Sequence, residues 1–219
     1  MKIFDELDIS NRLCFDVGSN IGDKTDKFLT KGASVVCIEP QEYCVSQLQM
    51  RYGNNDRVKI LKTALGSKDT VGLMYISNSH TLSTLSLEFI SETSKQRFVG
   101  NIWGEKEQVN ITTLDKIIEK YGKPKYCKID VEGYEVEILK GLSSTIEYIS
   151  IEFVPELKKN TFDSIEIINR LGNYRFNYVE GESETFQFEE WIDPERMIEF
   201  LIKNEDYRKS FGDLYAKLF

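Results

Sequence analysis

Short apolar runs alternate with amphipathic stretches along the first part of the chain. Residues 13–17, 34–39 and 58–62 are dominated by Val, Ile, Leu, Phe and Cys, whereas residues 23–31 and 42–52 carry apolar side chains at helical spacing. Short continuous apolar runs are typical of strands that are buried on both faces. Their alternation with helices predicts a parallel sheet with crossover helices.

This alternation is interrupted between residues 66 and 112. Residues 71–76 have the composition of a strand, residues 77–86 are rich in Ser, Thr and Asn, and residues 108–113 alternate apolar and polar positions before a helical pattern over 114–121. Long polar segments inside a compact domain are typical of lids and binding loops. We therefore expect an inserted hairpin and lid above the sheet.

The strand and helix patterns resume after this insertion. Strands are expected over residues 126–131 and 148–154, and helices over 135–140 and 163–171. Because these elements again alternate, the pattern predicts an α/β fold with a mostly parallel sheet and helices on both faces.

The last part of the chain has a different pattern. Residues 174–180 and 185–188 predict a closing antiparallel hairpin, and Pro194 opens a charged amphipathic segment. The apolar positions of that segment are Met197, Ile198, Leu201, Tyr207, Phe211, Leu214 and Leu218. We expect a domain over residues 1–190 and a helical extension over 191–219, which packs on the domain or on the partner chain of a homodimer.

The net charge and the pattern of cysteines limit the classes of function that fit the sequence. The formal net charge is −8, and no block of Lys and Arg is present that would bind a polyanion, so nucleic acid is not expected as a partner. No segment has the ~20 apolar residues of a membrane span, and the N-terminus lacks the pattern of a secretory signal. The four cysteines form no CxxC pair. These features favour a cytoplasmic protein with reduced thiols and no membrane span.

The first candidate site follows the first expected strand. Asp16 ends that strand, and Gly18, Asn20 and Gly22 form the turn into the next helix, where backbone N–H groups are free to bind a ligand. Glu39 ends the second strand, where an acid accepts hydrogen bonds from ribose hydroxyls. This D-x-G-x-x-x-G spacing differs from the G-x-G-x-x-G of dinucleotide sites. An acid beside the turn suits the ammonium and sulfonium groups of S-adenosylmethionine, although either acid alone also fits a helix cap.

The second candidate site is acidic. Asp130 and Glu132 follow one expected strand and Glu152 lies near the end of the next, at the edge where open α/β sheets bind ligands. The alternatives are a general base, hydrogen bonds to sugar-like hydroxyls, or a Mg²⁺ site at Asp130 and Glu152. A simpler interpretation is that Lys125 and Lys128 pair with these acids at the surface.

His80 is the only histidine, and it lies in the polar part of the insertion. A neutral imidazole is a suitable base for methyl transfer to a hydroxyl, so His80 is a catalytic candidate. Most histidines in polar loops are simply solvated, and the sequence does not separate these two interpretations.

Five segments occur in the order and spacing of one known family. They are Phe15-Asp-Val-Gly-Ser-Asn-Ile-Gly22, Ile38-Glu-Pro40, Ala64-Leu-Gly66, Thr113-Leu-Asp115 and Lys128-Ile-Asp-Val-Glu-Gly-Tyr-Glu135. Over about residues 13–154 the chain resembles the FkbM family of class I S-adenosylmethionine-dependent methyltransferases. The resemblance implies a seven-stranded Rossmann-like sheet and O-methylation of a hydroxyl on a sugar or small natural product.

The resemblance also implies roles for particular residues. The implied cofactor contacts are Asp16, Gly18, Ser19, Asn20, Gly22, Glu39, Pro40, Thr63, Ala64 and Asp130, with Thr63 and Ala64 beside the adenine. Asp130 and Glu132 are implied to face the methyl-transfer site. The family commonly has Ala in place of Ser19, a change that leaves the turn intact.

Two other functions compete with this one. A nicotinamide-dependent oxidoreductase has a similar sheet but requires the G-x-G-x-x-G turn that is missing here. A non-catalytic scaffold would use the C-terminal helices as its partner surface, but it would have no need of acids at Asp16, Glu39 and Asp130. We therefore expect a methyltransferase with S-adenosylmethionine as cofactor and a small molecule or saccharide as acceptor.

Overall fold

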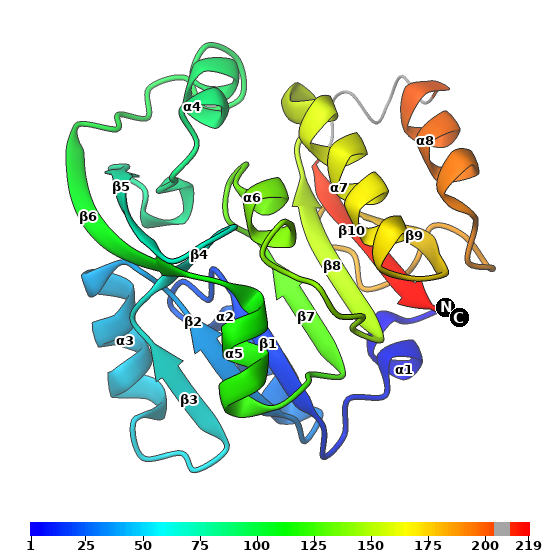
Figure 1. Cartoon of the computed structure of the whole chain (residues 1–219). Helices are drawn as coiled ribbons and strands as arrows, with labels where there is room; N and C mark the ends of the chain where they lie inside the picture. The colour runs from blue at the N-terminus through cyan, green and yellow to red at the C-terminus, as the bar shows by residue number, and fades with distance from the viewer. Residues whose placement is uncertain (204–210) are drawn as a thin grey trace.

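A computed structural model of the chain describes residues 1–203 and 211–219. Its main sheet has seven strands in the order β3-β2-β1-β7-β8-β10-β9 (Figure 1). The strands are β1 Leu13–Val17, β2 Ser34–Ile38, β3 Val58–Leu61, β7 Tyr126–Ile129, β8 Tyr148–Phe153, β9 Tyr174–Glu180 and β10 Gly212–Leu218. Because the order reverses between β1 and β7, the carboxyl ends of these two strands border the crevice in which such sheets bind ligands.

Strand direction agrees with the expected sheet. β1 pairs in parallel with both β2 and β7, and the remaining parallel pairs are β2 with β3 and β7 with β8. β10 runs antiparallel to both β8 and β9. The prediction of a seven-stranded, mostly parallel sheet with an antiparallel C-terminal pair is therefore confirmed.

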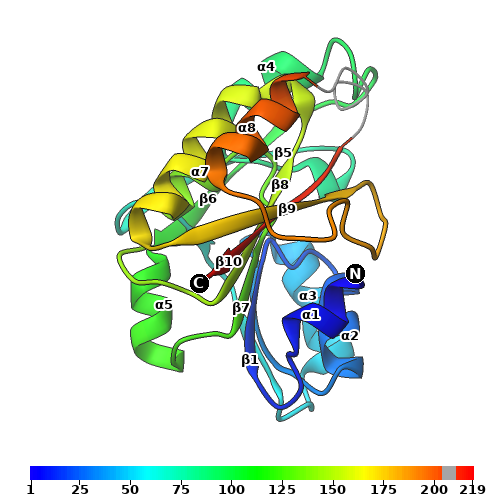
Figure 2. The same cartoon turned by 90° about the vertical axis from the view of Figure 1, so that its right-hand side faces the viewer.

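Helices cover both faces of this sheet. Figure 2 shows α1, α2 and α3 on one side and α5, α7 and α8 on the other. The helix bounds are α1 Ile3–Leu7, α2 Asp23–Thr30, α3 Glu42–Tyr52, α5 Leu114–Tyr121, α6 Glu135–Leu139, α7 Lys158–Leu171 and α8 Pro194–Lys203, with a 3-10 turn η2 at Pro155–Leu157. Among the described helices, none is long and apolar enough to cross a membrane.

Successive residues of β1 enter two different cores, which explains its unbroken apolar run. Phe15 and Val17 pack in the cluster on the α5 and α7 side, whereas Cys14 packs with Phe28 and Leu48 of α2 and α3. A strand buried on both faces requires apolar residues at successive positions rather than at alternate ones. Asp16 is the polar exception in β1.

The insertion forms a second, small sheet. β5 (Thr70–Ile76) pairs antiparallel with β6 (Glu105–Thr112), which also pairs with the short β4 (Ala64–Leu65). A 3-10 turn η1 (His80–Leu82) and helix α4 (Leu87–Thr93) lie between β5 and β6. The indole Nε1 of Trp103 donates to the Leu82 carbonyl at 2.7 Å, which ties the two sides of the insertion together.

The C-terminal expectations need correction. The partner of β9 is β10, not residues 185–188, although Gln187 N does donate to the Tyr178 carbonyl at 2.8 Å. Residues 191–219 are not a helical extension throughout, because α8 is followed by strand β10 inside the sheet. Phe211, Leu214 and Leu218 were expected on a helix, but Leu214 and Leu218 belong to β10 and Phe211 directly precedes it. Tyr207 lies outside the described residues.

Helix α8 uses its apolar face within the chain. Met197 and Leu201 are buried in the same core as residues of α7 and β9. The charged face of this helix remains exposed, which explains the amphipathic pattern without a partner chain.

Candidate functional site

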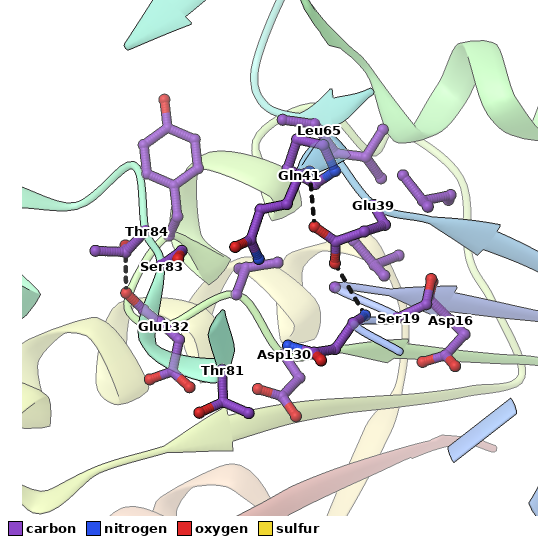
Figure 3. Close-up of a pocket in the computed structure, with 18 of the residues that line it drawn as sticks. Asp16, Ser19, Glu39, Gln41, Leu65, Thr81, Ser83, Thr84, Asp130 and Glu132 are labelled. Carbon is purple, nitrogen blue, oxygen red and sulfur yellow. Dashed lines mark hydrogen bonds between the residues drawn. The ribbon is translucent and has the colours of Figure 1, made fainter. Parts of the chain in front are cut away.

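A cavity of about 290 Å³ opens at the carboxyl ends of β1, β2 and β7. Twelve of the thirteen predicted site residues line it: Asp16, Gly18, Ser19, Asn20, Glu39, Pro40, Thr63, Ala64, His80, Asp130, Glu132 and Glu152. The thirteenth, Gly22, directly precedes α2 as its N-cap and lies against Tyr52, whose hydroxyl donates to the Gly22 carbonyl at 2.9 Å. The two acidic motifs therefore meet in one cavity (Figure 3). One motif comes from β1 and β2 and the other from β7 and β8, on opposite sides of the reversal in strand order.

Gly18 allows β1 and β7 to approach each other at the floor of the cavity. Its φ is +74°, and a Cβ built on it would lie only 1.9 Å from the Asp130 carbonyl oxygen. A side chain at this position would therefore clash with the backbone that carries Asp130. Only glycine fits at position 18, so no side chain covers the backbone of the turn here; we call this the bare Gly18 turn.

Asp16 is fully buried under α2. Its Oδ2 accepts a hydrogen bond from Thr25 Oγ1 at 2.6 Å, whereas its Oδ1 has no hydrogen-bond partner among the described residues. Burial raises the pKa of this carboxyl, against the opposing charge of Lys128. A buried carboxylate oxygen without a donor is costly, so this atom offers a place for a donor from a ligand.

Glu39 joins the two turns that border the cavity. Its Oε2 accepts from the backbone N–H of Asn20 and its Oε1 from that of Gln41, both at 2.9 Å. The side chain is buried, and this burial raises its pKa to about 7, although the two backbone donors favour the charged form. Each carboxylate oxygen keeps a second lone pair that can accept a hydrogen bond from a hydroxyl group.

The buried Glu39 predicts a particular pH dependence of stability. Because its pKa is raised from 4.5 to about 7, the folded state binds more protons than the unfolded state between these values. Its contribution to stability is therefore full below pH 4.5 and is lost as the pH rises through about 7. At about 1.4 kcal/mol per pKa unit, this amounts to about 3 kcal/mol.

Urea unfolding between pH 5 and pH 8 measures this effect. We expect Glu39→Gln to flatten the decline in stability over this range, and Glu119→Gln, a change at an exposed position of α5, to leave it unchanged. Equal pH profiles for the wild type and Glu39→Gln would contradict the prediction.

His80 closes the cavity with its backbone as well as its ring. Its carbonyl accepts from the side-chain amides of Asn20 at 3.3 Å and Gln41 at 3.1 Å. Its ring lies 5.7 Å from that of Tyr43, and within the described part of the chain its Nδ1 is buried without a hydrogen-bond partner. The insertion is thus held directly by the two turns after β1 and β2.

Three carboxylates gather at the other end of the cavity. Asp130, Glu132 and Glu152 each offer an oxygen, and these oxygens all lie within 4.8 Å of one another. Lys128 Nζ lies 2.5 Å from Asp130 Oδ2. Burial opposes the charged form of Asp130, but Lys128 outweighs it and holds the pKa of that carboxyl below its usual range. Burial and the neighbouring acids raise the pKa of both Glu132 and Glu152 well above the usual range.

A surface ion pair with the three carboxylates describes neither Lys125 nor Lys128. Lys125 pairs with Glu147 at 2.6 Å, away from the three carboxylates. Lys128 is only 3% exposed. Burial would lower its pKa, but Asp130, Asp16 and Asp213 outweigh this and raise it. Lys128 is thus a buried cation shared by several acids rather than a surface ion pair.

The sequence missed four residues that shape the site. Gln41 binds Glu39 and His80, Thr84 donates to the Glu132 carbonyl at 2.7 Å, and Glu135 accepts from the N–H groups of Val131 and Gly133. Asp213 faces Glu152 across the β8–β10 pair. Of these four residues, only Glu135 could have been found from the sequence, because it is the last acid of the Lys128–Glu135 motif.

Comparison with known proteins agrees with this geometry. The sequence matches the methyltransferase FkbM domain over residues 16–209. The chain belongs to this family. Methyltransferase sdnD of Sordaria araneosa is 31% identical over an alignment of 161 positions, and the alignment covers 61% of this chain and 61% of that protein. The match thus spans about three fifths of the length of this curated relative.

Solved structures with a similar fold are more distant. Precorrin-6y C5,15-methyltransferase from Geobacter metallireducens is 9% identical with a TM-score of 0.49, covering 99% of this chain and 85% of that one. An S-adenosylmethionine-dependent O-methyltransferase from Thermotoga maritima is 10% identical with a TM-score of 0.45, covering 99% and 63%. The family and the strand order identify the sheet as the Rossmann-like sheet of class I methyltransferases. At these TM-scores neither structure bears on the substrate of this FkbM domain.

Proposed function

We propose that this FkbM domain transfers a methyl group from S-adenosylmethionine to a hydroxyl of a saccharide or small natural product. The observation that carries the proposal is the shared cavity, which holds Glu39 and the bare Gly18 turn at one end and three carboxylates at the other. One end suits a cationic nucleoside, and the other suits an acceptor rich in hydrogen-bond donors.

The residues of the first end fit this cofactor. Asp16 Oδ1, buried and without a donor among the described residues, suits the cationic methionine end. Glu39 is proposed to accept hydrogen bonds from the ribose hydroxyls, and the turn at Gly18 and Asn20 is proposed to let the ligand approach the backbone. Further contacts are proposed for the residues beside them: Ser19 and Pro40 near the ribose, and Thr63 and Ala64 near the adenine.

The residues of the second end are proposed to bind the acceptor. When bound, the cofactor supplies an electrophilic methyl group, and the protein's contribution is to position the acceptor and exclude water. Asp130 stays ionised beside Lys128 and orients the acceptor hydroxyl, with Glu132, Glu152 and His80 around it. Since Lys128 already provides a cation at Asp130, the proposal assigns no Mg²⁺ to Asp130 and Glu152.

Two measurements test the proposal. Calorimetry with S-adenosylhomocysteine should show binding at micromolar concentrations. The absence of both heat and a thermal shift well above this range would exclude the cofactor. Asp130→Asn should bind S-adenosylhomocysteine within about twofold of the wild type and lose ~100-fold or more in methyl transfer. Unchanged transfer would remove Asp130 from the site.

A further inference from the structure

Glu132 has a backbone conformation that is unfavourable for its residue type. Its φ is +55°, in the left-handed region that glycine favours, and Gly133 follows with a φ of +87°. A residue with a β-carbon is destabilised in this conformation, because its Cβ comes too close to the following carbonyl oxygen. Such strain persists where the surroundings enforce it, and it is concentrated at functional sites.

Two neighbours hold Glu132 in this conformation. Thr84, from the insertion, donates its hydroxyl to the Glu132 carbonyl at 2.7 Å. Glu135, at the start of α6, accepts from the N–H of Val131 at 3.3 Å and of Gly133 at 3.1 Å, one on each side of Glu132. The loop is therefore braced on both sides of the residue, which fixes the direction of its side chain.

The side chain held in this way has a carboxylate oxygen without a protein donor. Among the described residues, Glu132 Oε2 is buried and has no hydrogen-bond partner. Asp130, by contrast, is bound to Lys128 at 2.5 Å. Figure 3 shows the carboxyl groups of Asp130 and Glu132 at the same end of the cavity.

We infer that Glu132, rather than Asp130, is the carboxylate that takes the proton from the acceptor hydroxyl. This inference rests on the proposed function. The acceptor oxygen forms its new bond to the methyl carbon as the bond from that carbon to sulfur breaks. The bonding pair stays on sulfur and neutralises it, and the hydroxyl proton moves to the Glu132 carboxylate. Asp130 keeps its charge and orients the hydroxyl.

The electrostatic surroundings support this division of roles. Glu132 is faced by Asp130 and Lys128 of the β7 edge, by Glu135 of α6 and by Glu152 of β8. Burial, then Asp130 and Glu135, raise the pKa of Glu132, and Lys128 opposes them. In its deprotonated form, a carboxylate with a raised pKa is a stronger base than one held charged by a lysine, and transfer through Glu132 requires that form.

The strain allows a test that separates catalysis from structure. Glu132→Gly removes both the strain and the carboxylate, so we expect the melting temperature to rise by about 2–4 °C while methyl transfer falls by about 10²–10⁴-fold. Glu132→Gln should lose a similar factor in transfer. Both variants should bind S-adenosylhomocysteine within about twofold of the wild type, because Glu132 lies at the acceptor end.

Added formate provides the decisive comparison. Formate can occupy the space vacated in Glu132→Gly and should restore transfer at least about tenfold there, but not in Glu132→Gln, where the space is filled. Transfer is measured with methyl-labelled S-adenosylmethionine and a pooled glycan and polar-metabolite fraction from the source cells. The control is Asn11→Gly, an exposed position with the same φ of +55° remote from the cavity, which should leave transfer unchanged.

Several results would contradict the assignment of Glu132 as the group that takes the proton. The assignment would be overturned if Glu132→Gln kept more than a tenth of wild-type transfer. It would also be overturned if Glu132→Gly melted at a lower temperature than the wild type. The same holds if formate restored transfer in Asp130→Gly but not in Glu132→Gly. In those cases the proposed function stands, since the wild type still transfers methyl groups. Wild-type protein that binds S-adenosylhomocysteine but labels nothing in the pooled fraction would remove both proposals.

Discussion

Replacing Lys128 by methionine is expected to lower the free energy of unfolding by about 3–5 kcal/mol at pH 8. Lys128 is almost completely buried and is the cation nearest to Asp130, with Asp16 and Asp213 also acting on it. Methionine fills a similar volume but leaves these acids without their counter-charge. A buried charge that loses its partner pays the full cost of desolvation.

The pH dependence and a control identify the cause. Without Lys128 the acids bind protons more readily, so the loss of stability should be smaller at pH 5 than at pH 8. Lys125→Met is the matched control, because the ion pair of Lys125 is with the partly exposed Glu147 and its loss should cost no more than about 1 kcal/mol. Urea unfolding of both variants measures the difference, and equal losses would show that the buried acid cluster does not depend on Lys128.

Gly18→Ala is expected to destabilise the protein by more than about 3 kcal/mol and to abolish binding of S-adenosylhomocysteine. The added Cβ would meet the Asp130 carbonyl oxygen at 1.9 Å, and that oxygen belongs to the backbone. Relief of this clash requires the ends of β1 and β7 to separate, which would open the floor of the cavity. Thermal unfolding and calorimetry measure the two effects.

Gly181→Ala separates the clash from the backbone conformation. Gly181 also has a positive φ, +54°, but a Cβ built there has no heavy atom within 4 Å among the described residues. It should therefore cost only about 1 kcal/mol and leave binding intact. If Gly18→Ala costs no more than Gly181→Ala, the close approach of β1 and β7 does not constrain the site.

The parallel part of the sheet was predictable because its strands are buried on both faces. Residues 13–17 were expected as a strand and form β1, and the helices over Glu42–Tyr52 and Leu114–Tyr121 begin and end where the periodicity placed them. In these segments the local pattern and the tertiary environment require the same residues. Sequence alone was therefore sufficient for them.

β10 was missed because its pattern fits two structures. Leu214 and Leu218 are four residues apart, which suits both one face of a helix and alternate positions of a strand. The structure places this segment between β8 and β9, where it pairs with both strands. The error also hid Asp213, whose carboxyl joins the acids around Lys128 only because β10 lies in the sheet.

The sequence by itself determined the strand–turn–helix at Asp16 to Gly22, the acid at Glu39 and the family, because these are local patterns of residue type and spacing. Tertiary structure decided which acids share Lys128, which oxygen of Asp16 and of Glu132 lacks a donor, and how Thr84 and Glu135 hold the loop between them. These features depend on distances between segments far apart in the chain. Such distances are set by the packing of strands against one another and are not encoded in the residues of any one segment.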